Sequence, residues 1–155
     1  MIRIGYGEDT HALVPDRPLR LAGLDIPSSR GPRAHSDGDA LLHALADALL
    51  SALALGDIGE LFPDTDPRWR DLESRTIVLR VLGELHQRGW RLAQLSAVVI
   101  LDQPKLAPHR RAMVESLARL LALSEDRIGL TFKTSEGLAP DFVQTRVMVL
   151  IEPSS

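Results

Sequence analysis

Cysteine is absent from this chain of 155 residues. Disulfide scaffolds, thiolate zinc sites and cysteine nucleophiles are therefore excluded, and any metal must be held by histidine, carboxylate or backbone oxygen. An apolar run of the roughly 18 residues that a membrane-spanning helix needs is also absent. The longest candidate, residues 40–55, is interrupted by His43, Asp47 and Ser51. Residues 1–5 are strand-like and unlike a signal peptide, so a soluble cytoplasmic protein without a membrane partner is expected.

An excess of positive charge is absent as well. The chain has 18 lysines and arginines against 21 acidic residues, a formal net charge of −3. This balance argues against a nucleic-acid partner, because such proteins normally present a strongly basic surface. The length suits one domain with a real hydrophobic core, so residues 1–155 are expected to form a single domain.

The most informative segment is an apolar helix expected from Ala40 to about Leu53. Ser36 and Asp37 are candidate residues for capping its start, and Gly56 for ending it. Four polar positions interrupt it at intervals of four residues: Asp39, His43, Asp47 and Ser51. They form one polar stripe on an otherwise buried helix. An unpaired buried polar group costs roughly 1–3 kcal/mol, so the stripe needs partners.

The remaining elements follow from apolar periodicity and from breaks at glycine and proline. Strands are expected over residues 1–7, 19–26, 90–101, 128–134 and 145–151, with helices over 74–88 and 109–121 and a helical turn over 124–127. Strands flank helices twice in the second half of the chain. The expected fold is an α/β (α+β) single-domain sandwich, in which one mostly β-α-β sheet is covered by helices on one face.

Asp9, His11 and His43 are a candidate metal site. In an extended strand Asp9 and His11 point to the same side, and His43 comes from the polar stripe. Two histidines and one carboxylate can hold zinc with a fourth position left open. The alternative is that His43 is an ordinary core histidine and Asp9 a strand-end acid. Asp47 could orient the His43 ring or simply accept a backbone hydrogen bond.

Two further groups suit phosphate and a hard cation. His35 and Ser36 stand at a helix start, where N–H groups favour anions, although such residues are more often ordinary caps. The loops 57–66 and 133–136 are rich in acids and hydroxyls, and Glu136 suits Mg²⁺ held largely through water and phosphate. Loops also gather acids merely because they are solvated. Together the three groups indicate phosphoryl chemistry.

Five motifs, in this order and spacing, carry a family resemblance: Asp9-Thr10-His11; residues 34–39 with His43; residues 56–59 with 61–67; residues 103–106 with Pro108-His109; and Lys133-Thr134-Ser135-Glu136. Over residues 1 to about 138 the chain resembles the 2-C-methyl-D-erythritol 2,4-cyclodiphosphate synthase family.

The resemblance implies a homotrimer with active sites between adjacent subunits. It implies a reaction of the non-mevalonate route to isoprenoids, on 4-diphosphocytidyl-2-C-methyl-D-erythritol 2-phosphate. The 2-phosphate attacks the β-phosphorus of the same molecule, which gives the cyclic diphosphate and releases CMP. The expected partner is thus a small cytidine nucleotide.

The resemblance also assigns residues. Asp9, His11 and His43 match the ligands of one zinc ion per active site, and Glu136 matches the residue that reaches Mg²⁺ or Mn²⁺ between the substrate phosphates. His35 and Thr134 match residues that stabilise the transition state. The matched substrate-binding residues are Ser36 for phosphate; Asp57, Ile58, Gly59, Phe62, Pro63, Asp64, Thr65 and Asp66 around erythritol and ribose; Leu101, Asp102, Gln103, Pro104, Lys105, Leu106 and Ala107 around cytosine; and Lys133 and Ser135 beside Thr134.

The chain departs from the family in three places. Residues 137–144 are short and lack a glycine-rich segment with an Arg-Gly-Glu-Gly run, and Glu8 replaces a frequent aromatic residue. Both places line the family's central channel, where a prenyl diphosphate can bind, so this accessory site is not carried over. Lys133 replaces a common hydroxyl residue. The rival interpretations are a zinc-dependent phosphohydrolase and a non-catalytic trimer that binds cytidine nucleotides.

Overall fold

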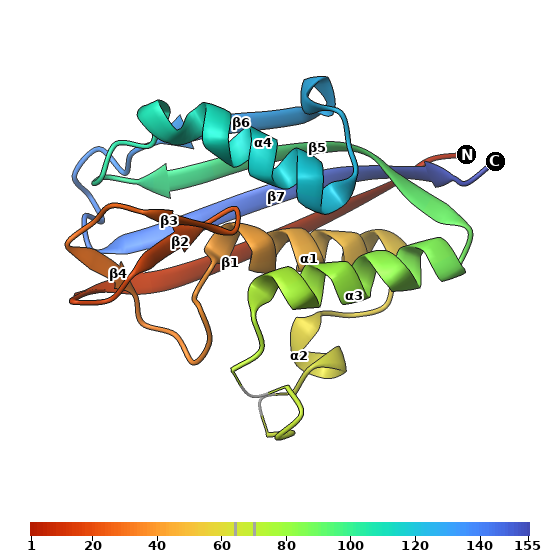
Figure 1. The fold of residues 1–155 in the computed structure, drawn as a ribbon, viewed down its shortest axis with the longest axis horizontal. Helices are drawn as coiled ribbons and strands as arrows, with labels where there is room; N and C mark the ends of the chain where they lie inside the picture. Colours follow the sequence, from red (N-terminus) through yellow and green to blue (C-terminus); the bar gives the residue numbers. More distant parts are fainter. Residues whose placement is uncertain (64, 70) are drawn as a thin grey trace.

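The computed structural model describes residues 1–63, 65–69 and 71–155. A five-stranded sheet runs in the order β4–β1–β7–β5–β6, and β2 and β3 form a separate hairpin (Figure 1). The strands are β1 Arg3–Pro15, β2 Leu19–Leu21, β3 Leu24–Ile26, β4 Arg30–Pro32, β5 Trp90–Leu101, β6 Ile128–Lys133 and β7 Phe142–Pro153. The helices are α1 Ala40–Leu53, α2 Ile58–Leu61, α3 Ser74–Gln87 and α4 Arg110–Leu121, with 3₁₀ turns at Ala107–His109 and Glu125–Arg127.

The single-domain α+β fold is confirmed, but the sheet is mixed rather than mostly β-α-β. Among the described strands only β5 and β6 pair in parallel, joined through α4. The C-terminal strand β7 lies between β1 and β5 and is antiparallel to both. Strand β1 also extends well beyond residue 7, because β7 pairs with it as far as Ala12 and β4 pairs with its last residues.

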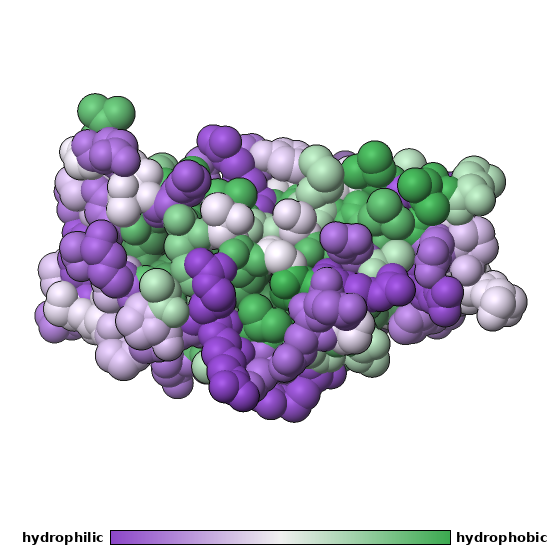
Figure 2. All heavy atoms as spheres, turned by 90° about the horizontal axis from the view of Figure 1, so that it is seen from above, coloured by the Kyte–Doolittle hydropathy of each residue, from purple (hydrophilic) through white to green (hydrophobic). Residues whose placement is uncertain are grey.

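The helices α1, α3 and α4 cover one face of the sheet (Figure 1). Along β7, alternate residues from Val143 to Ile151 are buried against them. The opposite face bears apolar side chains that stay exposed, among them Ile4 at 62%, Tyr6 at 46% and Met148 at 50%. Seen from above, apolar residues gather toward the end of the molecule where the termini lie (Figure 2). Within the described ranges, every helix is too short or too polar to cross a membrane.

Helix α1 lies directly on the backbone of β1. A Cβ atom at Gly5 would overlap the carbonyl oxygen of Ala48, and one at Gly7 would overlap that of Ala44. Neither glycine has a positive φ, so the requirement for glycine here is steric. Because α1 presents alanines to these glycines, the helix and the strand approach closely.

The ends of α1 differ from expectation. Asp39, not Ser36 or Asp37, is the N-cap, and its carboxylate accepts from the backbone N–H of Leu42. At the other end Ala54, not Gly56, takes the left-handed conformation with φ of 57°. The helix ends at Leu53, three residues before the glycine.

Each member of the polar stripe has its own partner. The fully buried carboxylate of Asp39 also accepts from the N–H groups at the β2–β3 turn, at 3.2 Å from Ala22 and 2.7 Å from Gly23. Ser51 Oγ accepts from the Tyr6 N–H at 3.4 Å. The stripe therefore joins α1 to its neighbours as well as contributing to a site.

Gly7→Ala should lower the free energy of unfolding by roughly 1–3 kcal/mol, because the added methyl group must push α1 away from β1. The measurement is urea denaturation followed by circular dichroism. Gly83→Ala within α3 is the matched control: a Cβ there meets nothing within 4 Å, and alanine favours a helix by about 0.5–1 kcal/mol. Equal stability of Gly7→Ala and the wild type would contradict the close packing.

Candidate metal and phosphate site

The structure brings Asp9, His11 and His43 together. Asp9 and His11 project from the same side of β1, as the strand period predicts, and His43 reaches them from α1. Asp9 Oδ2 lies 2.7 Å from His11 Nε2 and 3.5 Å from His43 Nδ1. One ligand atom from each residue lies within 4.8 Å of the other two, and all three residues are half-buried. This is the geometry of residues that can share one metal ion.

The electrostatics of this cluster favour a charged carboxylate beside the imidazoles. Burial raises the pKa of Asp9, but hydrogen bonds and the positive charge of His11 and His43 outweigh it, so the net pKa shift is downward. Burial lowers the pKa of His43, but the hydrogen bond to Asp9 and nearby acids raise it overall. The donor set of two ring nitrogens and one carboxylate oxygen fits zinc.

Asp47 does not orient the His43 ring. Its Oδ1 accepts from the backbone N–H of Ile58 at 2.8 Å, which is the backbone alternative that the sequence left open. Burial raises the pKa of Asp47, while this hydrogen bond opposes the shift. The buried His43 Nε2 has no hydrogen-bond partner among the described residues, so the second ring nitrogen is not fixed by a neighbouring carboxylate.

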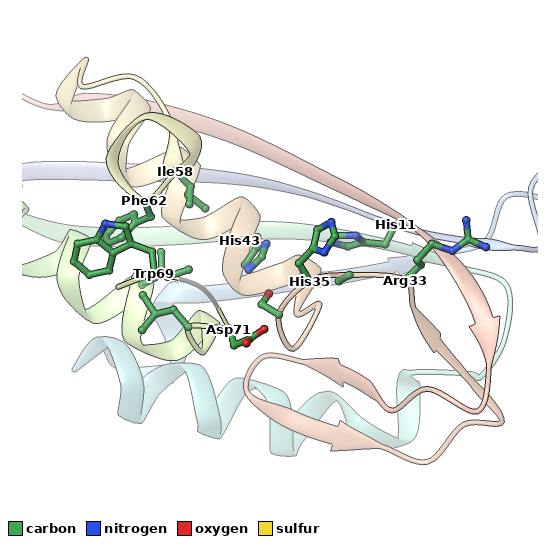
Figure 3. A pocket seen from close by; sticks show the side chains of 12 residues that line it. His11, Arg33, His35, His43, Ile58, Phe62, Trp69 and Asp71 are labelled. Carbon is green, nitrogen blue, oxygen red and sulfur yellow. The ribbon is translucent and has the colours of Figure 1, made fainter. Parts of the chain in front are cut away.

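A cavity of about 600 Å³ opens beside this cluster. Figure 3 shows its polar end, where the rings of His11 and His35 lie close together, His43 projects from α1, and the side chain of Arg33 extends away from the histidines. Among the described residues, those that line it are His11, Arg33, Ala34, His35, Ser36, His43, Ile58, Phe62, Trp69, Asp71, Leu72 and Ile77. The predicted phosphate residues therefore lie next to the predicted metal ligands.

The polar end of the cavity is formed by side chains more than by the start of α1. Asp39 already accepts from the Leu42 N–H in the first turn of α1. His35 and Ser36 precede this cap and face the cavity. A phosphate would thus meet an imidazole and a hydroxyl group rather than the free N–H groups that the sequence suggested.

Asp37 connects the His35–Ser36 segment to α3. Its carboxylate accepts from the backbone N–H of Ser74 at 3.1 Å and from the Ser74 hydroxyl group. Glu73, the N-cap of α3, makes no side-chain hydrogen bond there. Asp37 therefore supplies the cap of α3 rather than that of α1, and it fixes one wall of the cavity against the other.

The 57–66 region contributes only in part. Ile58 and Phe62 line the cavity, and the Phe62 ring packs edge-on against Trp69 with centroids 5.1 Å apart. Asp57 caps α2 by accepting from Glu60 N–H at 3.1 Å. Gly59, Pro63, Thr65 and Asp66 do not line the cavity, and Asp64 falls outside the described residues.

Asp66 instead pairs with Arg68 at 2.8 Å. The hydrogen bonds from Arg68 hold the pKa of the Asp66 carboxyl below its ordinary value. The contributions of Trp69 and Asp71 to the cavity had no signal in the sequence, since they belong to an irregular loop without a periodic pattern. Arg33 could have been found from its place beside the phosphate motif.

The other predicted residues gather elsewhere on the chain. A second hollow of about 200 Å³ is lined by Leu101, Lys105, Leu106, Ala107, Phe132, Lys133 and Thr134. It shares no lining residue with the first cavity. Ser135 and Glu136 follow Thr134 in the adjoining turn, and Asp102, Gln103 and Pro104 lie in the loop without lining the hollow. One chain therefore holds the predicted site residues in two separate groups.

Comparisons with known proteins agree with the motifs. A family model described as the YgbB family matches residues 2–152. A 2-C-methyl-D-erythritol 2,4-cyclodiphosphate synthase from Thermus thermophilus is 64% identical over 151 residues, which cover 97% of this chain and 99% of the relative. A solved synthase of the same name with CDP bound has a TM-score of 0.94 at 61% identity, and covers 97% of this chain and 100% of that one.

A second solved synthase of this name has a TM-score of 0.95 at 63% identity, again over 97% of this chain and 100% of the other. The match thus extends over nearly the whole length of both chains, in sequence and in fold, and confirms the resemblance. The chain belongs to the YgbB family, whose relatives at this level of identity are 2-C-methyl-D-erythritol 2,4-cyclodiphosphate synthases.

Proposed function

We propose that this chain catalyses the reaction named in its relatives: the intramolecular cyclisation of 4-diphosphocytidyl-2-C-methyl-D-erythritol 2-phosphate to 2-C-methyl-D-erythritol 2,4-cyclodiphosphate, with release of CMP. The observation that carries the proposal is the Asp9, His11 and His43 cluster at one end of a cavity that His35 and Ser36 also line. A metal site and a phosphate site in one cavity suit the transfer of a phosphoryl group.

The reaction forms a bond from a 2-phosphate oxygen to the β-phosphorus and breaks the bond from that phosphorus to the oxygen that leaves with CMP. The nucleophile is already an anion, so no strong general base is needed. The obstacle is the approach of one anion to another. Holding both phosphates in one cavity removes most of the entropic part of this cost, and positive charge offsets the repulsion.

We assign the chain's residues to these tasks. Asp9, His11 and His43 would hold zinc, which when bound supplies positive charge and polarises a phosphate oxygen. His35 donates a hydrogen bond to a phosphate oxygen as negative charge develops there. The hydroxyl group of Ser36 donates a second hydrogen bond to the phosphate. Arg33 lines the same cavity and adds a fixed positive charge in a chain whose net charge is −3.

The second hollow suits the nucleotide. Its apolar floor from Leu101, Leu106 and Phe132 can contact a flat base, while Lys105 and Lys133 provide positive charge. A relative of this chain binds CDP, which supports a cytidine nucleotide here. Thr134 would stabilise the transition state, and Glu136 would hold Mg²⁺ or Mn²⁺ between the substrate phosphates.

We infer that the active site is completed between subunits of a homotrimer. The substrate needs the metal cavity and the nucleotide hollow at once, and these share no lining residue in one chain. The open face of the sheet offers exposed Ile4, Tyr6 and Met148 for association. Closed cyclic assembly through a head-to-tail interface would place the cavity of one chain against the hollow of the next.

The test of the function is a turnover assay read by mass spectrometry, with the cytidine diphosphate substrate, Zn²⁺ and Mg²⁺, and an EDTA control. Release of CMP with a cyclic product that chelation abolishes is the expected result. A linear product that has gained one water would identify a zinc-dependent phosphohydrolase instead. Saturable CMP binding without turnover would leave a non-catalytic nucleotide-binding protein.

His43→Ala should lose bound zinc and nearly all activity, because one of three protein ligands is removed. Zinc content by atomic emission measures the first effect, and CMP release the second. His86→Ala is the control, since His86 lies in the last turn of α3 and belongs to no proposed ligand set. Full zinc occupancy in His43→Ala would contradict the assignment of the metal site.

Mixing two inactive variants should restore activity if sites form between subunits. His43→Ala damages the metal cavity, and Glu136→Gln damages the nucleotide half, which is the second hollow with the adjoining turn of Ser135 and Glu136. In a mixed trimer, an interface that joins the metal cavity of a Glu136→Gln chain to the nucleotide half of a His43→Ala chain therefore has two intact halves. Random assembly should recover about one quarter of the sites. The variants are unfolded together, refolded and assayed against each refolded alone. No recovery, with mixed trimers seen by native mass spectrometry, would place both halves of a site in one chain.

A further inference from the structure

Two loops of the nucleotide half follow neighbouring strands. Strands β5 and β6 are parallel, and Ile100 pairs with Lys133 at their carboxyl ends. Asp102 stands two residues beyond the first of these positions, and Ser135 two residues beyond the second. The two side chains therefore emerge side by side at one edge of the sheet, although 33 residues separate them in the sequence.

The carboxylate of Asp102 is fully engaged with Ser135. Its Oδ1 accepts from the Ser135 backbone N–H at 2.6 Å, and its Oδ2 accepts from the Ser135 hydroxyl group at 2.9 Å. A charged acceptor makes stronger hydrogen bonds than a neutral one. The expectation from the sequence places Asp102 among the residues around cytosine, but both its oxygens face the neighbouring turn.

Ser135 also accepts hydrogen bonds from other residues of its own turn. Its Oγ accepts from the backbone N–H of Ala139 at 2.9 Å, and its carbonyl accepts from Leu138 N–H at 3.1 Å. Thr134 Oγ1 accepts from Glu136 N–H at 3.2 Å. Asp102 thus anchors Ser135, which lies between Thr134 and Glu136 in the turn.

The turn needs such an anchor. Glu136 has a φ of 57°, a left-handed conformation that a side chain disfavours. Thr134 and Glu136 are both exposed, so packing does little to hold them. Within the described part of the chain, Thr134 and Glu136 bond only to each other across the turn, and the residue between them, Ser135, is the one that Asp102 holds.

We propose that Asp102 is a positioning residue, which holds the turn of Thr134 and Glu136 in its active conformation and couples that turn to the nucleotide loop. The proposal rests on the proposed function for the roles of Thr134 and Glu136. Because the loop that contains Asp102 also lines the nucleotide hollow through Leu101 and Lys105, a nucleotide that orders this loop orders the metal-binding turn at the same time.

Asp102→Ala should lower kcat by about 10- to 100-fold, since a small displacement of reacting groups costs this much. It should also raise the Mg²⁺ concentration needed for half-maximal activity, while zinc content stays at the wild-type level. Asp102→Asn keeps one acceptor oxygen for the Ser135 N–H and should recover part of the loss. A purely structural role would lower the melting temperature without changing the Mg²⁺ dependence.

The matched control is Asp126→Ala. Asp126 also accepts a serine hydroxyl hydrogen bond, from Ser124 at 2.6 Å, but just before the opposite end of β6. Asp102→Ala and Ser135→Ala should be strongly non-additive in a double-mutant cycle on kcat, because each removes the same contact. Wild-type kcat and Mg²⁺ dependence in Asp102→Ala, or an equal loss in Asp126→Ala, would overturn the proposal.

A second readout separates this proposal from the proposed function. Hydrogen exchange of the wild-type and Asp102→Ala proteins needs no turnover, and amides of residues 135–139 should exchange roughly 10-fold faster or more in the variant, because local opening becomes easier. Calorimetric titration with CDP and Mn²⁺ should show that Mn²⁺ no longer strengthens CDP binding in the variant. If the wild type lacks CMP release but both effects appear, the proposed function fails and the coupling stands. Unchanged exchange and binding would refute the coupling.

Discussion

The contact between α1 and the backbone of β1 is the constraint on which the rest of the structure depends. Gly5 and Gly7 leave no room for side chains beneath the carbonyl groups of Ala48 and Ala44. The helix can therefore lie close enough for His43, the neighbour of Ala44, to reach Asp9 two residues beyond Gly7. A larger residue at either glycine would push α1 away from β1, which would loosen the core and separate His43 from Asp9. Stability and the geometry of the candidate metal site therefore depend on the same contact.

Aspartates then fix the loops around the site. Asp39 holds the β2–β3 turn, Asp47 holds the start of α2, Asp37 holds the start of α3, and Asp102 holds the turn after β6. Each accepts from a backbone N–H group of another segment, which a short acidic side chain does with little loss of conformational entropy. The chain is acidic overall, yet these carboxylates are engaged in structure, and the polar end of the cavity is lined by histidines, a serine and an arginine.

Local patterns predicted what depends on local geometry. Period two placed Asp9 and His11 on one side of a strand, and a spacing of four placed His43 and Asp47 on one stripe. The sequence could not show that β7 inserts between β1 and β5, because the pairing of β1 with β7 is settled by residues far apart in the chain. For the same reason Asp37 was expected to cap the helix that follows it, whereas it caps α3, which starts 37 residues later. The resemblance supplied the site residues, but not the partners of their side chains.

The division of the site residues into two groups has a thermodynamic consequence. A chain that holds the metal cavity and the nucleotide hollow apart cannot complete the proposed site by folding alone, so assembly and site formation become one equilibrium. If the proposed site is shared between chains, a substrate that spans both halves would bind only the assembled form and would stabilise it by mass action. The two loops joined by Asp102 and Ser135 belong to the same half, so this half can be ordered before association. The interface then needs only to bring two preorganised surfaces together, which lowers the entropic cost of forming the site.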